Sequence, residues 1–457
     1  MKFRIVRSIA LLVTFVGSFG WAQLISGPTL DGLWASDGFR RVLEVQGDHV
    51  RNYEVTAVSC LFKWEVIGKV DVDGSIAFLQ NGCLRRLVLK PATDTASLTS
   101  DCCVTDFLWH RLSEKPKGFG QKIENTPQKN YDIFWHTFAE NYPFFALHQK
   151  NWNAIDQKYR PLVTAQTTPK ELWDIFLHMV SGLHDAHVYL EAPDLKARWY
   201  GRRPDDPNHV GSVLSDDWKR GLEIVKTKYV PGLKDYGNDF IHFGMTEEGI
   251  AYLCINTFGA YVPGNVFADQ KLAMDQAFDE IYQTSGSWKG LILDVRQNTG
   301  GFAGMDVWTA TRLTGERYLA YTTETRDNLD GPMHFTPRQQ IWVNPAARPG
   351  FLGKVVVLMG RDTVSSGENT VMSLMGRKPA VVKIGENTQG VFSEILERVL
   401  PNGWKFGLPD QIGRTAEGKA FDVVGIPPDI PVPVLTPQEL KEGRDSCMEK
   451  AIEMIMK

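Results

Sequence analysis

The feature that most constrains the fold is an alternation of apolar and amphipathic segments after residue 240. Four short apolar runs, IAYLCINTF, GLILDV, KVVVLM and AVVKIG, have the length and composition of buried strands. Between them lie segments with helical spacing, VFADQKLAMDQAFDEIYQ, GMDVWTATRLTG and NTVMSLMG. Strands separated by helices predict an α/β core with a mostly buried sheet. We assign this core to residues 239–457, with hairpin-like segments near its end.

Two further units are expected before the core. In residues 23–115, short alternating segments are separated by Gly, Asp and Asn turns, which is typical of a small antiparallel β barrel or sandwich. Residues 116–238 begin with a polar linker and continue with helices after Thr126-Pro127, around 152–159 and after Thr168-Pro169. The end of this unit, from 193 to 238, is rich in Gly, Pro and Asp and is expected to be a long loop. The overall fold class is therefore α+β or α/β.

Residues 1–22 have the pattern of a bacterial secretory signal peptide. Three basic residues precede an apolar stretch, and Gly20-Trp21-Ala22 forms a small-residue cleavage site before Gln23. The pattern predicts a periplasmic or extracellular protein, with an uncleaved N-terminal anchor as the alternative. The formal net charge is −4 without a basic run, which gives no electrostatic reason to expect a nucleic-acid partner.

Four of the six cysteines lie close together in the N-terminal unit. In an oxidising compartment Cys60, Cys83, Cys102 and Cys103 could form two disulfides with three possible connectivities. We expect the adjacent pair Cys102-Cys103 to bond outward to Cys60 and Cys83. A zinc site is the alternative, although no paired CxxC spacing supports it.

The segment 354–368, KVVVLMGRDTVSSGE, is the strongest candidate for chemistry. An apolar strand breaks at Gly360, presents Ser365 and Ser366, and runs into a helix. A serine in such a turn can expose its hydroxyl beside the free N–H groups of a helix N-terminus, as a nucleophile requires. The alternative is that one of the two serines only caps the helix.

A serine nucleophile also needs a base, an orienting acid and an oxyanion hole. The turn after GLILDVRQNT offers Gly300 and Gly301, whose N–H groups can approach a substrate oxygen closely. His187 in LHDAHVYL is a candidate base. His184, Asp185 and His187 together could instead hold a metal, but their spacing matches no reliable ligand motif.

Two acids, Asp422 and Asp429, lie in the segment GKAFDVVGIPPDIPVPV near the end of the core. We interpret Asp429 as a turn residue. Asp422 stays a candidate for the orienting acid.

Four motifs in order resemble the tail-specific or C-terminal processing proteases and the catalytic core of tricorn protease. They are GLILDVRQNTGG, VVVLMGRDTVSSGENT, KIGENTQG and VVGIPPDIPV, and the resemblance extends over about 125–435, with the helical segment from WHTFAENYP to LHDAHVYL included. Aligned by the Glu of the serine motif, the resemblance implies Ser365 as the nucleophile. It also implies oxyanion donors from Ser366 and from the Gly300-Gly301 turn.

The resemblance favours the tricorn-like branch with a histidine base. Proteases of the Ser-Lys type carry a lysine where this chain has Val391, and Lys383 is not expected to replace it. The tricorn-like pattern implies His187 as the base, with Ala186 in place of a serine and Asp422 in place of a glutamate. Because Asp is one methylene shorter than Glu, Asp185 is kept as an alternative orienting acid.

These motifs together predict a secreted serine peptidase that hydrolyses polypeptide substrates without a cofactor or metal. The competing hypothesis is a non-catalytic protein that binds apolar ligands or peptides on the same fold, as the retinoid-binding relatives of this family do.

Overall fold

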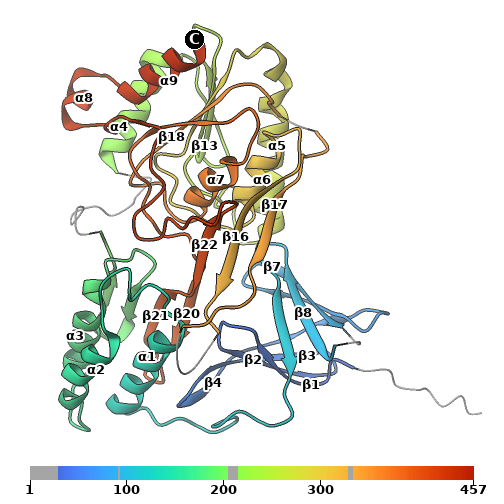
Figure 1. Cartoon of the computed structure of the whole chain (residues 1–457), viewed down its shortest axis with the longest axis vertical. Helices are drawn as coiled ribbons and strands as arrows, with labels where there is room; N and C mark the ends of the chain where they lie inside the picture. The colour runs from blue at the N-terminus through green and yellow to red at the C-terminus, as the bar shows by residue number, and fades with distance from the viewer. Residues whose placement is uncertain (1–28, 91–92, 204–214, 328–332, 349) are drawn as a thin grey trace, which may run out of the picture.

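The computed structural model describes residues 29–90, 93–203, 215–327, 333–348 and 350–457 (Figure 1). The predicted signal peptide lies outside these ranges. Within them, no helix is both long and apolar enough to cross a membrane.

The N-terminal unit is one antiparallel sheet that curls into a near-barrel, as predicted. Its strand order is β4-β3-β2-β1-β9-β8-β7-β6-β5. Alternate side chains of the strands, such as Trp34, Val45 and Trp109, are buried inside. The strands are β1 (Gly32–Ser36), β2 (Arg41–Gln46), β3 (His49–Thr56), β4 (Ser59–Ile67), β5 (Lys69–Val70), β6 (Ile76–Gln80), β7 (Cys83–Lys90), β8 (Thr95–Ser100) and β9 (Phe107–Arg111).

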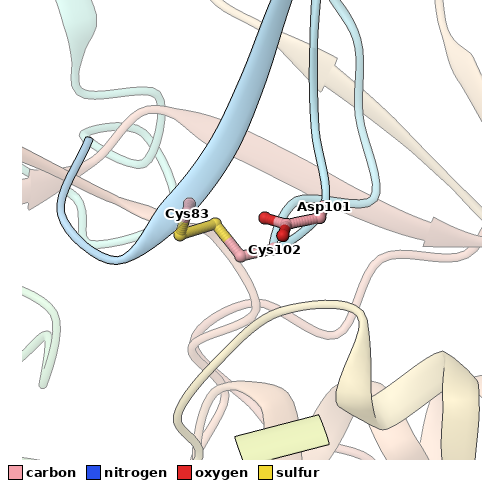
Figure 2. A group of neighbouring side chains, drawn as sticks. All are labelled: Cys83, Asp101 and Cys102. Atoms are coloured by element: carbon pink, nitrogen blue, oxygen red, sulfur yellow. A yellow bond between two sulfur atoms is a disulfide. The ribbon is translucent and has the colours of Figure 1, made fainter. Parts of the chain in front are cut away.

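One disulfide joins Cys83 to Cys102, while Cys60 and Cys103 are free thiols (Figure 2). The expected bond from the adjacent cysteine pair to Cys83 is therefore confirmed, whereas the expected second bond, to Cys60, is wrong in this structure. Cys60 packs in a separate small cluster of the sheet, whereas Cys83 and Cys102 lie against the apolar cluster of the core. Asp101 lies beside the disulfide, but sulfur atoms bonded to each other cannot serve as the thiolate ligands of a zinc ion.

The helices expected in the second unit are present and begin at the expected caps. They are α1 (Pro127–Asn141), α2 (Trp152–Tyr159) and α3 (Pro169–Val180), followed by β10 (Tyr189–Ala192) and β11 (Ala197–Tyr200). Thr126 accepts a hydrogen bond from Lys129 N–H, and Thr168 forms a capping box with Glu171. Short 3₁₀ turns are η1 (Arg160–Leu162), η2 (Ser181–Leu183) and η3 (Pro193–Leu195).

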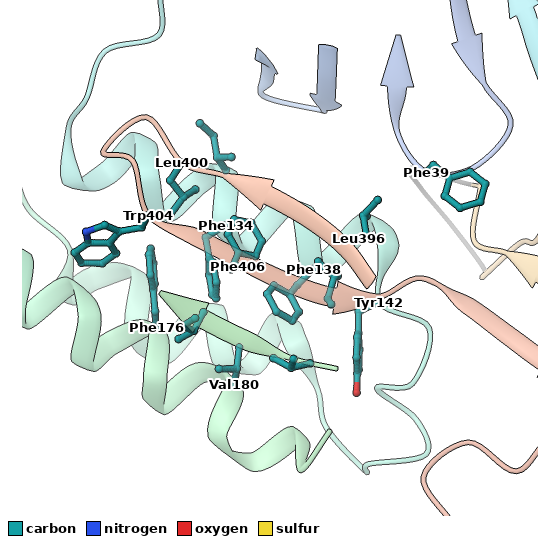
Figure 3. Close-up of a cluster of buried hydrophobic side chains, with 14 of the residues drawn as sticks. Phe39, Phe134, Phe138, Tyr142, Phe176, Val180, Leu396, Leu400, Trp404 and Phe406 are labelled. Atoms are coloured by element: carbon teal, nitrogen blue, oxygen red, sulfur yellow. The ribbon is translucent and has the colours of Figure 1, made fainter. Parts of the chain in front are cut away.

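A hairpin from the end of the chain completes this helical unit. Strands β20 (Ile395–Val399) and β21 (Lys405–Pro409) join β10 and β11 in a sheet of order β11-β10-β21-β20. Aromatic and aliphatic side chains from the hairpin and from α1 and α3 form one buried cluster (Figure 3), which includes Phe134, Phe138, Phe176, Leu396, Trp404 and Phe406. The hairpin therefore joins the sheet of the helical unit, although it lies within residues 239–457, which we assign to the core.

The stretch predicted as a long loop contains regular structure. Helix α4 (Asp216–Ile224) continues into the π-helical turn η4 (Val225–Tyr229), and β12 (Lys234–Tyr236) follows. Ser215 caps α4, and Trp218, Ile224 and Val225 are buried against the core sheet. A short amphipathic helix within a polar sequence was missed because few apolar residues carry its periodicity.

The α/β core confirms the predicted alternation. Its sheet has the order β12-β13-β14-β15-β18-β19-β23, and the strands from β14 onward run parallel. The strands are β13 (Ile241–Met245), β14 (Ala251–Ile255), β15 (Leu291–Asp294), β18 (Val355–Met359), β19 (Val382–Gly385) and β23 (Ile430–Pro431).

Helices cover both faces of this sheet. One face packs against α5 (Phe267–Ile281), α6 (Met305–Thr311) and α7 (Ser366–Leu374), and the turn η5 (Tyr282–Ser287) follows α5. The other packs against α4 and α9 (Ser446–Met456), with α8 (Pro437–Glu442) nearby. A small sheet, β17-β16-β22, lies beside the core and is formed by β16 (Tyr318–Thr325), β17 (Gln339–Val343) and β22 (Gln411–Thr415).

A buried ion group fastens the core sheet to its last helix. Arg296 follows β15 and pairs with Asp294 Oδ2 at 2.6 Å and with Asp445 Oδ2 at 2.9 Å. All three side chains are almost fully buried, and Asp445 also caps α9. The Asp and Arg of the DVRQN motif therefore link the end of β15 to the start of α9.

Candidate active site

The serine turn and the glycine turn follow neighbouring parallel strands. Because β15 and β18 are paired in parallel, the segments after Asp294 and Met359 emerge at the same edge of the sheet. This edge is where α/β folds place their sites. The two turns are joined directly by a hydrogen bond of 2.9 Å from Val364 N–H to Asn298 O.

Ser365 lies between strand and helix in a strained backbone conformation. Its φ is 56° and its ψ is −124°, immediately before α7 begins. A positive φ is unfavourable for a residue with a Cβ and persists only where the surroundings hold it. Thr363 supplies part of that support, since its hydroxyl donates to Val295 O and accepts from Gly360 N–H.

Glu368 is a residue whose role sequence reasoning missed, although it is the fixed Glu of the serine motif. Its carboxylate is buried and accepts hydrogen bonds from the backbone N–H groups of Ser365 at 3.3 Å, Gly390 at 2.6 Å and Val391 at 2.8 Å. Burial raises its pKa to about 7, against the effect of these hydrogen bonds. Glu368 thus ties the serine turn to the loop where the Ser-Lys proteases would carry their lysine.

The glycine turn presents Gly301 rather than Gly300 as a donor. Gly300 N–H already donates to Asn298 Oδ1 at 2.9 Å, and Asn298 Nδ2 donates to Ile255 O. Within the described residues, the amides of Gly301 and Ser366 have no acceptor in the chain. Ser366 Oγ donates to Gly301 O at 3.2 Å, which holds these two amides in a fixed relation.

His187 and Ser365 line the same cavity, whose volume is about 530 Å³. His187 comes from the segment between η2 and β10, so the fold brings together two units distant in sequence. Its imidazole is buried, and burial lowers its pKa to about 4, while hydrogen bonding with the Ser393 backbone acts in the opposite direction. The base candidate is therefore neutral near pH 7, with Nδ1 unpartnered among the described residues.

The two candidate acids have different surroundings. Asp185 accepts the His187 backbone N–H at Oδ1 and the Tyr142 hydroxyl at Oδ2, both at 2.9 Å. Tyr142 lies at one end of the aromatic cluster with its hydroxyl pointing away from it (Figure 3). Burial raises the pKa of Asp185 to about 6. Asp185 thus supports the backbone at His187 rather than the imidazole.

Asp422 is buried, and neither carboxylate oxygen has a hydrogen-bond partner among the described residues. Burial, followed by the nearby charges of Glu368 and Asp185, raises its pKa well above the ordinary value. Asp422 and the His187 Nδ1 atom are therefore both buried polar groups without a hydrogen-bond partner among the described residues, which is a costly state in a folded protein.

The remaining candidates are used elsewhere or do not converge. Lys383 Nζ pairs with Asp429 Oδ1 at 2.7 Å, so this lysine and the turn aspartate stabilise β19 and the loop before β23. Among the described residues, Cys83, Asp101 and Cys102 are the only group of three potential metal ligands close together. The metal alternative at His184, Asp185 and His187 thus has no support from their geometry.

Comparison with known proteins gives two family matches. Residues 249–432 match the model of peptidase family S41, and residues 123–181 match the tricorn protease C1 domain. No curated protein matches the chain in sequence.

Solved structures share the fold. A putative peptidase from Parabacteroides merdae is 25% identical with a TM-score of 0.59, and the match covers 73% of this chain and 98% of that one. Mature CPAF is 11% identical with a TM-score of 0.51, over 72% and 96% of the two chains. The complex of mature CPAF with lactacystin matches at 11% identity and a TM-score of 0.52, over 72% and 97%.

Proposed function

We propose that this chain, a serine peptidase whose residues 249–432 match peptidase family S41, hydrolyses peptide bonds through an acyl-enzyme with Ser365 as nucleophile and His187 as base. The observation that carries this proposal is the shared cavity, into which the strained serine turn and the buried, neutral imidazole both open. A serine nucleophile requires a neutral base within reach, and burial keeps His187 in that form.

The first half of the reaction forms the acyl-enzyme. The Ser365 hydroxyl attacks the scissile carbonyl carbon while His187 takes its proton. The N–H groups of Gly301 and Ser366 stabilise the negative oxygen that develops, because neither donates elsewhere in the described chain. His187 then gives the proton to the leaving amine, the C–N bond breaks, and an ester on Ser365 remains.

The second half releases the acid product. A water molecule attacks the ester carbonyl, His187 takes one of its protons and returns it to Ser365 Oγ, and the carboxylic acid departs. We assign to Asp422 the role of accepting a hydrogen bond from His187 Nδ1–H, which stabilises the imidazolium when it forms. This assignment rests on its unpartnered oxygens, whereas those of Asp185 are occupied.

Covalent labelling tests the nucleophile. A fluorophosphonate probe should label the protein at Ser365, and labelling should disappear in Ser365→Ala. Ser373→Ala is a matched control, because it removes a buried hydroxyl from α7, the helix that follows Ser365, outside the cavity lining. Absence of labelling in the folded wild type would instead favour the non-catalytic binding hypothesis.

Peptide hydrolysis tests the pair. Ser365→Ala and His187→Ala should each lower kcat by several orders of magnitude, and the double variant should be little worse than either single one, because the two groups act as a unit. Hydrolysis that survives Ser365→Ala would disprove the assignment.

We also propose export to the periplasm or the exterior. The signal-like segment 1–22 and the Cys83–Cys102 disulfide both support an oxidising destination. N-terminal sequencing of the protein isolated from a bacterial periplasm should give Gln23 as the first residue.

A further inference from the structure

A second cavity lies between the strands of the N-terminal near-barrel and strand β20 of the returning hairpin. Its volume is about 230 Å³, and its described lining shares only Ile395 with the cavity beside Ser365. Neither Ser365 nor His187 lines it. Pockets for drug-sized ligands measure about 300–1,000 Å³, so this cavity suits a smaller molecule.

The near-barrel side of this cavity carries two arginines, Arg41 of β2 and Arg85 of β7. Among the residues that the structure describes, neither guanidinium forms a hydrogen bond or an ion pair. Arg41 lies over the rings of Phe39 and Phe107, 5.5 and 5.7 Å from their centres. Arg85 Nε is buried without a partner, and burial lowers the pKa of this guanidinium. Both side chains therefore keep donors for an acceptor inside the cavity.

The β20 side of the cavity carries two carboxylates, Glu394 and Glu397. Neither forms an ion pair within the described part of the chain. Glu397 Oε2 accepts a hydrogen bond from the Tyr189 hydroxyl at 2.8 Å, and Glu394 Oε1 is buried without a partner. Lys63 also lines the cavity, but its ammonium group pairs with Glu54 Oε1 at 2.5 Å and donates to the backbone oxygen of Glu397. This lysine therefore leaves both carboxylates without a cation.

The opposite charges of the two sides act on each other without contact. Burial raises the pKa of Glu394, whereas the charges of Arg41 and Arg85 lower it. Charges withdrawn from water are costly unless they are paired and hydrogen-bonded. A ligand with one charge of each sign would pair with both sides, because guanidinium groups bind carboxylates and carboxylates accept hydrogen bonds from ammonium groups. Trp64 and Phe107 add aromatic surface for an apolar part of the ligand.

We propose that this cavity binds a small zwitterion, either a free α-amino acid or a dipeptide. The carboxylate of the ligand pairs with Arg41 and Arg85. Its ammonium group lies at Glu394, with Glu397 as a second acceptor. The inference does not depend on the proposed function, because binding here requires no turnover and uses none of the residues assigned to the reaction.

Isothermal titration calorimetry on the wild type tests the need for both charges. L-leucine is the probe, isocaproate is its analogue without the ammonium group, and L-leucinamide is its analogue without the carboxylate. L-leucine should bind at least about tenfold more tightly than either analogue, which is the scale of one charged hydrogen bond. An analogue that binds as tightly as L-leucine would overturn the proposal.

The dipeptide L-leucylglycine separates the two sources of the zwitterion. Its binding is measured on Ser365→Ala, beside L-leucine on the same protein, so that turnover does not consume it. Tighter binding of L-leucine identifies a free amino acid as the ligand, and tighter binding of L-leucylglycine identifies a short peptide. Absence of binding by both would overturn the proposal, whether or not Ser365 proves to be the nucleophile.

Variants of the arginines test the carboxylate end. Arg41→Gln and Arg85→Gln should each weaken the binding of L-leucine about tenfold, by the loss of one charged hydrogen bond. Arg86→Gln is a matched control, because the next residue of β7 lies outside the cavity lining and pairs with Asp71. It should bind L-leucine as the wild type does. Unchanged binding in both Arg41→Gln and Arg85→Gln would refute the assignment.

Glu394→Gln tests the ammonium end and separates a lost contact from a damaged cavity. It should weaken the binding of L-leucine but not that of isocaproate, because removing a carboxylate removes a repulsion from an anion. A distorted cavity would instead weaken both ligands, and equal weakening of both would overturn the assignment of the ammonium group to Glu394.

Discussion

Replacing Gly300 with alanine should displace Ser365 by a distance that can be calculated from the structure. A Cβ at this position would lie 2.7 Å from Ser365 Cβ and 3.0 Å from Val364 O. Since carbon atoms in contact are about 3.5–4.0 Å apart, the serine must move by roughly 0.8 Å or more. A shift of about 1 Å in a reacting group can cost roughly 10²-fold in rate. We therefore expect Gly300→Ala to lower kcat/KM about 10²-fold.

Gly300→Ala also strains the backbone, and an alanine substitution at a second glycine measures the backbone strain alone. Gly300 and Gly418 share a φ of 87°, but a Cβ at Gly418 would meet nothing within 4 Å. Both variants should lose about 1–2 kcal/mol of stability from the left-handed backbone. Gly300→Ala should lose about 1–3 kcal/mol more, because the added carbon overpacks a rigid turn.

The assays are peptide hydrolysis and urea unfolding followed by tryptophan fluorescence. Gly418→Ala should keep wild-type kcat/KM and show only the backbone share of the destabilisation. If Gly300→Ala were as active as Gly418→Ala, the contact between the glycine turn and Ser365 would not position the nucleophile, and the reasoning would fail.

Three further predictions concern titration, the disulfide and the buried ion group. The acid limb of kcat/KM should lie near pH 4, because burial lowers the pKa of His187, and a limb near pH 6.5 would contradict the burial argument. For the same reason, the contribution of the neutral imidazole to the free energy of unfolding should be full above pH 6.5 and decline toward pH 4. Peptide mapping should find Cys83 bonded to Cys102, and Cys83→Ser should destabilise the β unit by about 3 kcal/mol, with Cys103→Ser as a control that keeps the disulfide. Arg296→Met should cost about 3–5 kcal/mol in chemical denaturation, because it leaves two buried carboxylates without a cation. Loss of the exposed Arg444–Glu449 pair through Arg444→Met should cost less than about 1 kcal/mol.

Local signals accounted for most of the elements. The Thr-Pro pairs marked the starts of α1 and α3, and the predicted helix at 152–159 coincides with α2. The apolar runs before the serine and glycine turns are the central parallel strands of the core. Each of these signals is carried by residues within one turn or one strand, so a single sequence suffices to read it.

Such local signals do not predict which distant segments of the chain pack together. The sequence of β20 and β21 is typical of a β-hairpin and does not indicate its partner. Only the packing of Trp404 and Phe406 on α1 and α3 shows that this hairpin belongs with the helical unit and not with the core sheet. The roles of Asn298 and Glu368 as braces depend on acceptor and donor groups from other segments. Cysteine pairing likewise depends on which face of the sheet each thiol occupies. The serine and histidine were predictable as candidates, whereas their supports were not.

The returning hairpin makes folding of this chain a long-range event. Tyr189 of β10 pairs with Gly407 of β21, so the pairing closes a loop of roughly 200 residues. The entropic cost of closing this loop precedes the stabilisation that the strand pairing provides. The helices that precede the core cannot complete their apolar cluster until almost the whole chain has been synthesised. Because His187 lies directly before β10, the base reaches its place only after that late closure. A partly synthesised chain therefore carries the serine turn without its base, which would keep the peptidase inactive until the fold is complete.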